Sequence, residues 1–347
     1  MDEIEVLKVL SEELGPSGRE DRVREIITQM IKGYVDEFTV DVMGNLIARK
    51  GEGKPVLMLA AHMDEVGFLV RFITEKGFLK VAALGGINVY ATIGSRVAIL
   101  KEEGGDIEGV LGTIPPHLLR KKDSQPKQPT IEDLFIDVGA KSRDEALEMG
   151  IKIGDYATFV QKFAMKNDIM FGKAFDDRLG CSVMVSLIKG IKDVPGTVYF
   201  VFTVQEEVGL RGAHVAANRI KPDIAIALEG TIAADIPGVS PENYITQIGE
   251  GPAIRLMDAR TLANRKLVDI LVNVAEERGI KYQLQISPYS GTDAGAIQFA
   301  GTGVAVTAVS VPARYIHNPL TLALKSDYLA TIKLLKEAIP EILHKFR

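Results

Sequence analysis

The chain has 347 residues, of which 46% are hydrophobic and 25% charged, so it has enough apolar material for a packed core and a length that suggests about two domains. Its net charge of −5, without a dense basic stretch, argues against nucleic acid and anionic membranes as main partners. The single cysteine, Cys181, excludes an intrachain disulfide and a cysteine-based zinc cluster. No apolar run reaches the roughly 18 residues that span a bilayer, and residues 1–15 lack the pattern of a signal peptide, so we expect a cytoplasmic protein.

The N-terminal segment is predicted to contain two helices and a buried strand. The first helix covers residues 4–13. Ser17 and Glu20 have the spacing of a capping box, which predicts that a second helix begins there and runs to about Ile31. Residues 56–61 form a short apolar run, which favours a buried strand over a helix because helices are usually longer.

The pattern changes between residues 67 and 160, where short β-rich pieces are separated by glycines. These pieces are residues 68–73, 78–81, 96–100, 107–114 and 156–163. They predict a small antiparallel β unit. Inside it, residues 120–130 (RKKDSQPKQPT) are polar and contain two prolines, which predicts a mobile loop. We interpret 67–160 as an inserted domain, and 1–66 with 161–347 as the domain that it interrupts.

Beyond residue 171, predicted helices alternate with apolar strands, which is typical of an α/β sandwich. The helices are expected at residues 180–191, 212–219, 267–278 and 326–346, and the strands at 197–204, 224–228, 282–286 and 304–309.

Metal-capable side chains follow several of the predicted strands. Open α/β sheets bind ligands at the carboxyl ends of their strands, so we expect these side chains to meet at one edge. A further carboxylate pair, Asp176-Asp177, precedes the helix predicted at 180–191. The side chains that follow strands are His62, Asp64, Glu206, Glu207, Glu229 and His317.

Two histidines and several carboxylates without a thiolate form a ligand set for zinc, cobalt or manganese. The carboxylates outnumber what one cation needs, and two cations sharing a bridging carboxylate would relieve their repulsion. Asp64 is interpreted as a residue that orients His62. Glu206 and Glu207 are neighbours, so on an extended chain one could bind a metal while the other faces the bound water as a general base. The pattern therefore predicts a metal-assisted hydrolase.

Six segments closely resemble the family of tetrahedral (TET) aminopeptidases, the dodecameric dinuclear-metal peptidases of archaea and bacteria. The matching segments are GPSGRE at 15–20, AAHMDEVGF at 60–68, KAFDDRLGC at 173–181, VQEEVGLRGA at 204–213, GTDAGA at 291–296 and VPARYIHNP at 311–319. The resemblance implies that Asp176 bridges two divalent ions, zinc or cobalt. His62 and Glu229 would complete the ligands of one ion, and Glu207 and His317 those of the other.

The resemblance further implies that Glu206 is the general base and that Asp64 supports His62. The implied fold is a three-layer α/β/α dinuclear metallopeptidase domain with an inserted small β-barrel-like dimerisation domain. One position departs from the family, because Glu229 stands where an aspartate is usual. This departure bears on metal affinity and preference rather than on the class of reaction. Asp293 in GTDAGA is either a turn residue or part of the substrate pocket.

The expected function is removal of the N-terminal residue from short peptides by a homo-oligomer, in which dimers assemble into a dodecamer. Neutral N-terminal residues are the favoured substrates. Three alternatives remain open at this point. A glycoside hydrolase would need only two carboxylates and would leave His62 and His317 without a role. Another metal-dependent amide hydrolase, such as a deacylase, would not require a free amine, and a non-catalytic peptide-binding scaffold would not need Glu206.

Overall fold

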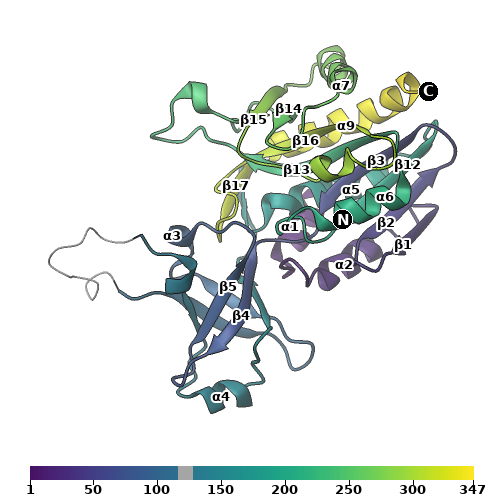
Figure 1. Ribbon diagram of the computed structural model, residues 1–347. Coiled ribbons are helices and arrows are strands. Elements are labelled where there is room, and N and C mark those ends of the chain that lie inside the picture. The colour runs from purple at the N-terminus through teal and green to yellow at the C-terminus, as the bar shows by residue number, and fades with distance from the viewer. Residues whose placement is uncertain (116–127) are drawn as a thin grey trace.

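The computed structural model describes residues 1–115 and 128–347, and Figure 1 shows the arrangement of their helices and strands. The helices are α1 (Glu3–Glu12), α2 (Asp21–Ile31), α3 (Val89–Thr92), α4 (Arg143–Glu148), α5 (Phe175–Gly190), α6 (Arg211–Ile220), α7 (Arg265–Glu277), α8 (Ala294–Ile297) and α9 (Lys325–Lys345), with 3₁₀ helices at Ile131–Asp133 and Pro241–Asn243. The first strands are β1 (Glu37–Val40), β2 (Leu46–Gly51), β3 (Val56–His62), β4 (Gly67–Ile73), β5 (Leu79–Leu84), β6 (Arg96–Ile99), β7 (Ile107–Gly112), β8 (Phe135–Asp137) and β9 (Tyr156–Phe159). The remaining strands are β10 (Ala164–Lys166), β11 (Ile169–Gly172), β12 (Thr197–Thr203), β13 (Ile224–Ile232), β14 (Ala253–Asp258), β15 (Gln283–Ser287), β16 (Ala305–Arg314) and β17 (Thr321–Leu324).

The larger of the two β structures is an open mixed sheet. Its described strands number eleven and run in the order β1-β2-β12-β3-β13-β16-β17-β11-β10, with β14 and β15 attached beside β16. The four central strands, β12, β3, β13 and β16, are parallel to one another. Parallel strands are buried on both faces, which explains why these segments of the sequence are continuous apolar runs.

Helices cover both faces of this sheet, as Figure 1 shows. Strand β3 illustrates the arrangement, because successive side chains of a strand point to opposite faces. Leu57 and Leu59 belong to the larger core, which also includes residues of α1, α2, α5, α7 and α9. Met58 and Ala60 belong to a smaller core with residues of α6 and α8. The three-layer α/β/α arrangement expected from the sequence is therefore confirmed.

The segment between β3 and α5 contains a closed barrel of six described strands in the order β4-β5-β8-β7-β6-β9. It has a core of its own, in which the rings of Phe68 and Phe159 meet edge to face with their centroids 5.5 Å apart. In Figure 1 the barrel projects from the larger sheet as a separate lobe. The expected small barrel is confirmed, whereas the exact domain boundaries and the role of the barrel in dimerisation stay predictions.

The predicted capping box at Ser17 and Glu20 is wrong. Helix α2 begins at Asp21 and has no side-chain cap. The hydroxyl of Ser17 donates instead to Asp64 Oδ2 at 2.6 Å. Glu20 Oε1 accepts the N–H groups of Gly18 and Gln205, because tertiary contacts outcompete the local motif.

Other elements were not predicted, among them the six-residue strands β2 and β14. The three-residue strand β8 and the helix α4 were missed, since neither is long enough to show a periodic pattern. Strand β13 continues beyond the predicted residues 224–228 to Ile232, so Glu229 lies within it. Most of the loop predicted at 120–130 lies outside the described residues. Among the residues that the structure covers, no helix combines the length and apolar character that crossing a bilayer requires.

Candidate active site

The carboxyl ends of the central parallel strands meet at one edge of the larger sheet and bring the predicted site residues together. His62 is the last residue of β3, Glu229 lies in β13, and His317 follows β16. Asp176 is the second residue of α5, and its backbone torsions and those of Asp177 are not helical. All the predicted metal ligands and Glu206 line one cavity of about 370 Å³, whereas Asp64 is fully buried behind it.

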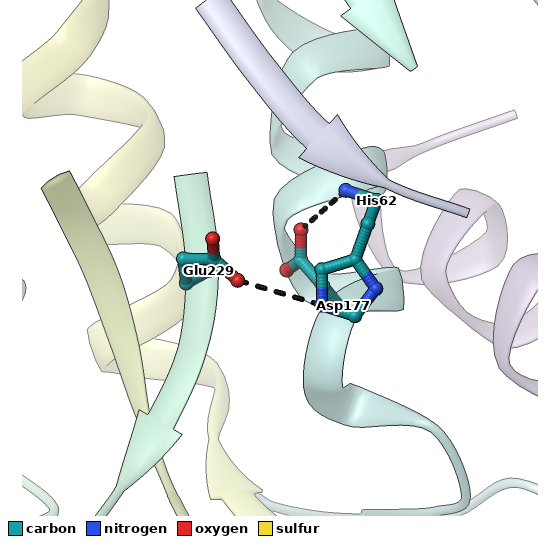
Figure 2. Close-up of side chains that lie close together, drawn as sticks. All are labelled: His62, Asp177 and Glu229. Atoms are coloured by element: carbon teal, nitrogen blue, oxygen red, sulfur yellow. Dashed lines mark hydrogen bonds and ion pairs between the residues drawn. The ribbon is translucent and has the colours of Figure 1, made fainter. Parts of the chain in front are cut away.

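Asp176 lies between the two histidines. Its Oδ1 is 3.3 Å from His62 Nε2, and its Oδ2 is 3.3 Å from His317 Nε2. Glu229 Oε2 lies 3.5 Å from the same nitrogen of His62, as Figure 2 shows, and Glu207 Oε1 lies 3.3 Å from the same nitrogen of His317. Two imidazole-carboxylate clusters therefore share one carboxylate, an arrangement of side chains that could hold cations.

Asp177 also lies within ligand distance of His62 and Glu229, but its oxygens are already engaged. Oδ2 accepts the backbone N–H of His62 at 3.1 Å, and Figure 2 shows this bond. Oδ1 accepts the N–H groups of Gly180 at 2.8 Å and Gly230 at 3.0 Å. The carboxylate thus connects β3, β13 and the first turn of α5. We attribute to Asp177 the positioning of these elements rather than a place among the ligands.

The pair Glu206-Glu207 lies in a turn after β12 rather than on an extended chain, because Gln205 has the left-handed torsion φ of 56°. The alternation argument made from the sequence therefore does not apply here. Both backbone N–H groups instead bind the carboxylate of Asp64, at 3.0 Å for Glu206 and 3.1 Å for Glu207. With the backbone held in this way, Glu206 Oε2 lies 4.0 Å from His62 Nε2, while the side chain of Glu207 reaches His317.

His62 is oriented mainly by the main chain. Its Nδ1 lies 3.0 Å from the carbonyl oxygen of Asp64, whereas the carboxylate oxygen Oδ1 is 3.5 Å away. A protonated Nδ1 that donates to this carbonyl leaves Nε2 free to bind a cation. The sequence predicted Asp64 as the orienting residue but could not reveal that its side chain serves the Glu206-Glu207 turn and Ser17.

A buried ion-pair cluster near the site was missed in the sequence, although its basic residues lie within KAFDDRLG and its carboxylate, Glu65, lies within AAHMDEVGF. Lys173 Nζ donates to Glu65 Oε1 at 2.6 Å, and Arg178 donates to the same oxygen at 3.3 Å. Arg178 also donates to the carbonyl oxygen of Met63 at 2.9 Å. These contacts fix the segment that leaves β3 against the start of α5, and so they hold His62 and Asp176 in register.

The electrostatics of the site favour added positive charge. Burial raises the pKa of Glu206 and that of Glu229 well above the ordinary range; the charge of Glu229 adds to the effect at Glu206, and that of Asp177 adds to it at Glu229. Burial opposes the charge of His317, but Asp176 and Glu207 outweigh it and raise the pKa of this imidazole to about 11. A cluster of this kind must take up protons or bind cations.

Comparison with known proteins agrees with this geometry. The family described as M42 glutamyl aminopeptidase matches residues 44–334. A putative aminopeptidase of Acetivibrio thermocellus is 42% identical over 97% of this chain and 98% of its own length. A lysyl aminopeptidase of Pyrococcus furiosus is 35% identical over 97% of each chain.

Solved structures share the whole fold. The TET aminopeptidase from the marine sediment archaeon Thaumarchaeota archaeon SCGC AB-539-E09 superposes with a TM-score of 0.94 at 36% identity, covering 99% of each chain. The TET1 peptidase of Pyrococcus horikoshii, described as able to assemble into a tetrahedron or a large octahedral shell, has a TM-score of 0.88 at 36% identity, covering 98% of this chain and 100% of its own. With its fold, its residues 44–334 and nearly its full length matched in this way, the chain belongs to the M42 aminopeptidase family and is a peptide hydrolase of the aminopeptidase type.

Proposed function

We propose that this aminopeptidase uses two divalent metal ions, zinc or cobalt, that share the carboxylate of Asp176. The observation that carries the proposal is the position of Asp176, with one oxygen 3.3 Å from each histidine. His62 and Glu229 complete one set of ligands in this proposal. Glu207 and His317 complete the other.

The residues present fit such ions. Glu207 Oε1 is buried and lies 3.3 Å from His317 Nε2, yet it has no hydrogen-bond partner among the described residues. A buried carboxylate oxygen without a hydrogen bond is costly unless a cation faces it; the His317 imidazolium can do so, and a metal ion held by both side chains would take its place. Imidazole nitrogens and carboxylate oxygens without thiolate suit zinc and cobalt.

The proposed catalytic role of Glu206 follows from its position. Two bound cations would supply a water of lowered pKa and stabilise negative charge on the peptide carbonyl. Glu206 lines the cavity, and its carboxylate accepts no hydrogen bond from the described residues, so it is free to accept a proton from water. Burial raises the pKa of Glu206, which suits a group that first takes this proton and then delivers it to the leaving amine.

The proposed substrates are short peptides with a free N-terminus, and the proposed location is the cytoplasm. We further propose that the chain forms a homo-oligomer in which the barrel, assigned to residues 67–160, mediates dimerisation and dimers assemble into a dodecamer. The TET1 peptidase of Pyrococcus horikoshii, which is described as able to assemble into a tetrahedron or a large octahedral shell, supports this proposal by its similarity over the whole chain. Light scattering of metal-replete protein that gives the mass of a monomer would contradict it.

The proposed activity is tested by hydrolysis of aminoacyl-p-nitroanilides and their N-acetylated counterparts, before and after chelation and with zinc or cobalt restored. We expect cleavage of the free-amine substrates alone, loss of activity on chelation and recovery with metal. Equal cleavage of the acetylated substrates would indicate a deacylase or another amide hydrolase. Activity that survives complete metal removal would refute the two-metal proposal.

A further inference from the structure

The inserted barrel reaches the proposed metal ligands through one short segment. Residues 85–88, the GGIN segment, connect β5 to α3, which lies in Figure 1 at the end of the barrel lobe nearer to the larger sheet. Gly86 lines the same cavity as the two histidines, and Gly85 lies against the side chain of Glu207. The lobe that is proposed to mediate dimerisation therefore also forms part of the wall of the site.

Gly85 leaves room for Glu207. Its φ of 82° lies in the left-handed region, which favours glycine. A Cβ at this position would lie 3.0 Å from the Cβ of Glu207, 3.2 Å from its Oε2 and 2.9 Å from Cγ1 of Val66. Contacts this short are repulsive, so a side chain here would displace a neighbour or the segment itself. The carboxylate of Glu207 is thus bounded by Gly85 beside Oε2 and by His317, 3.3 Å away, beside Oε1.

The imidazole of His317 is held differently from that of His62. Nδ1 of His62 lies 3.0 Å from the carbonyl oxygen of Asp64, whereas Nδ1 of His317 has no hydrogen-bond partner in the described part of the chain. A Cβ at Gly86 would lie 3.4 Å from this Nδ1, so the glycine backbone packs against that edge of the ring. The carbonyl oxygen of His317 accepts the N–H of Asn88 at the long distance of 3.5 Å. Packing against the GGIN segment therefore takes the place of a hydrogen bond that would orient the ring.

The GGIN segment is itself fixed to the barrel. Leu84, which precedes it, is the last residue of β5 and pairs with Gly67 of β4. Ile87 packs against the barrel core, to which Val66 also belongs. The chain that leaves the larger sheet and the GGIN segment therefore meet at Val66 and Gly85. The barrel, rather than the sheet that carries most of the proposed ligands, sets the position of the segment.

We infer that Gly85 and Gly86 position the second proposed ligand set, so that the inserted barrel is a working part of the metal site. That set consists of Glu207 and His317, and the inference rests on the proposed function, in which both bind one ion together with Asp176. Residues that orient metal ligands from outside change metal affinity by about 10- to 100-fold when they are replaced. The other ligand set stands on strands of the larger sheet, so it should keep its ion when the GGIN segment is altered.

The test is cobalt binding to metal-stripped protein at one protomer concentration, measured by calorimetry and by elemental analysis after dialysis. Gly85→Ala should weaken the binding of one of the two ions by about 10- to 100-fold and leave the other unchanged. Gly94→Ala is the matched control. Gly94 also lies in the barrel and has a similar φ of 84°, but nothing lies within 4 Å of an added Cβ. It should keep both ions, because it carries similar backbone strain without the contact.

A second pair of variants avoids backbone strain. The φ of Gly86 lies outside the left-handed region, and an added Cβ would make only an ordinary contact with His317. Gly86→Ala should therefore keep both ions. Gly86→Val adds two methyl groups beside the imidazole and should lose the second ion. If Gly85→Ala does not fold, this pair decides the question.

A double-mutant cycle tests whether Gly85 acts through Glu207. Glu207→Ala removes one proposed ligand and should itself weaken the second ion. In that background Gly85→Ala should cause no further loss of cobalt affinity, because the side chain that it displaces is already absent. A general loosening of the fold by Gly85→Ala would instead add to the effect of Glu207→Ala.

The outcomes separate the inference from the proposed function. If the unsubstituted protein binds two ions, the inference is overturned by unchanged binding in folded Gly85→Ala or in Gly86→Val. An equal loss in Gly94→Ala, or an additive cycle, overturns it as well, and in each case the two-metal proposal stands. If the unsubstituted protein binds fewer than two ions, the two-metal proposal fails and the inference fails with it.

Discussion

Replacing Asp64 by asparagine tests how the site is held together. The carboxylate of Asp64 is fully buried. Its Oδ1 accepts the N–H of Glu206, and its Oδ2 accepts the N–H of Glu207 and the hydroxyl of Ser17. In Asp64→Asn one of these oxygens becomes an NH₂ donor. Even in the better orientation, with the nitrogen at the Oδ1 position, the N–H of Glu206 loses its acceptor and faces another donor.

The expected loss of stability follows from the single hydrogen bond between the N–H of Glu206 and Asp64. A hydrogen bond to a charged group contributes about 1.5–3 kcal/mol, so we expect Asp64→Asn to lower the free energy of unfolding by about 2 kcal/mol, roughly 30-fold in the equilibrium constant. Burial opposes the charge of Asp64, but His62, Ser17 and the turn lower the pKa of this carboxyl below its ordinary value of 3.8. A lowered pKa stabilises the folded state above the unfolded pKa, and this contribution is lost as the pH falls through the folded pKa. The free energy of unfolding of Asp64→Asn should therefore lie below that of the unsubstituted protein by the same amount at pH 7 and pH 5, and the two values should converge only in stronger acid.

The assay is urea unfolding of metal-stripped protein at a fixed protomer concentration, because metal and assembly both add stability by mass action. Ser17→Ala is a comparison variant, since it removes one hydrogen bond to the carboxylate, worth about 1.5–3 kcal/mol, and leaves both backbone bonds of Asp64 intact. In metal-restored Asp64→Asn, displacement of Glu206 should lower kcat by about 100-fold. An unfolding midpoint equal to that of the unsubstituted protein would refute the reasoning. Unchanged stability with weaker metal binding would instead favour the orienting role at His62 that the sequence predicted.

Four further predictions concern the site and its support. Glu206→Gln should retain its metal, measured by elemental analysis, and lose about 10²–10⁴-fold in kcat; near-normal turnover would rule out the base. Asp176→Asn should lower the metal content of dialysed protein at both positions, because both clusters share this carboxylate. Glu229→Asp should weaken metal binding rather than improve it, since the carbon skeleton retracts by about 1.5 Å; tighter binding by calorimetry would contradict this. Burial, followed by the charge of Asp64, raises the pKa of Glu20 from 4.5 to about 7, so ionisation destabilises the fold as the pH rises through 7. Glu20→Gln should therefore be the more stable protein at pH 8 by up to about 3 kcal/mol, and the gain should be absent at pH 4.

Much of the catalytic cluster could be predicted because its positions follow from sheet geometry. His62 and Glu229 stand at or near the ends of parallel strands, and such ends meet at one edge whatever the intervening chain contains. The apolar runs that predict those strands extend over several residues, so the strands and the side chains that follow them were found together. The barrel was predicted for a related reason, since its short strands are separated by glycines, although β8 is too short to give a signal.

Contacts between distant segments could not be predicted from the sequence. Ser17 and Glu20 have the spacing of a local cap. Their side chains instead form hydrogen bonds with Asp64 and Gln205, which lie 47 and 185 residues away in the sequence. The N–H groups of the Glu206-Glu207 turn are bound by a residue 142 positions earlier in the chain. Hydrogen bonds of this kind depend on which elements become neighbours in the fold, and local sequence propensity does not predict tertiary neighbours.

The residues that line the cavity differ in the same way, since some stand on regular elements and others on loops. The proposed metal ligands stand largely on strands of one rigid sheet and on the helix packed against it, so small changes in surrounding loops leave their geometry intact. Arg260 also lines the cavity but lies in a loop, and its backbone is held by Asp258 at the end of β14 and by Gln298 after α8. Loops tolerate substitution better than the elements that they connect. A fold built in this way can keep the proposed metal ligands while the loop residues around them change, so specificity has to be determined from the whole cavity rather than from the ligands alone.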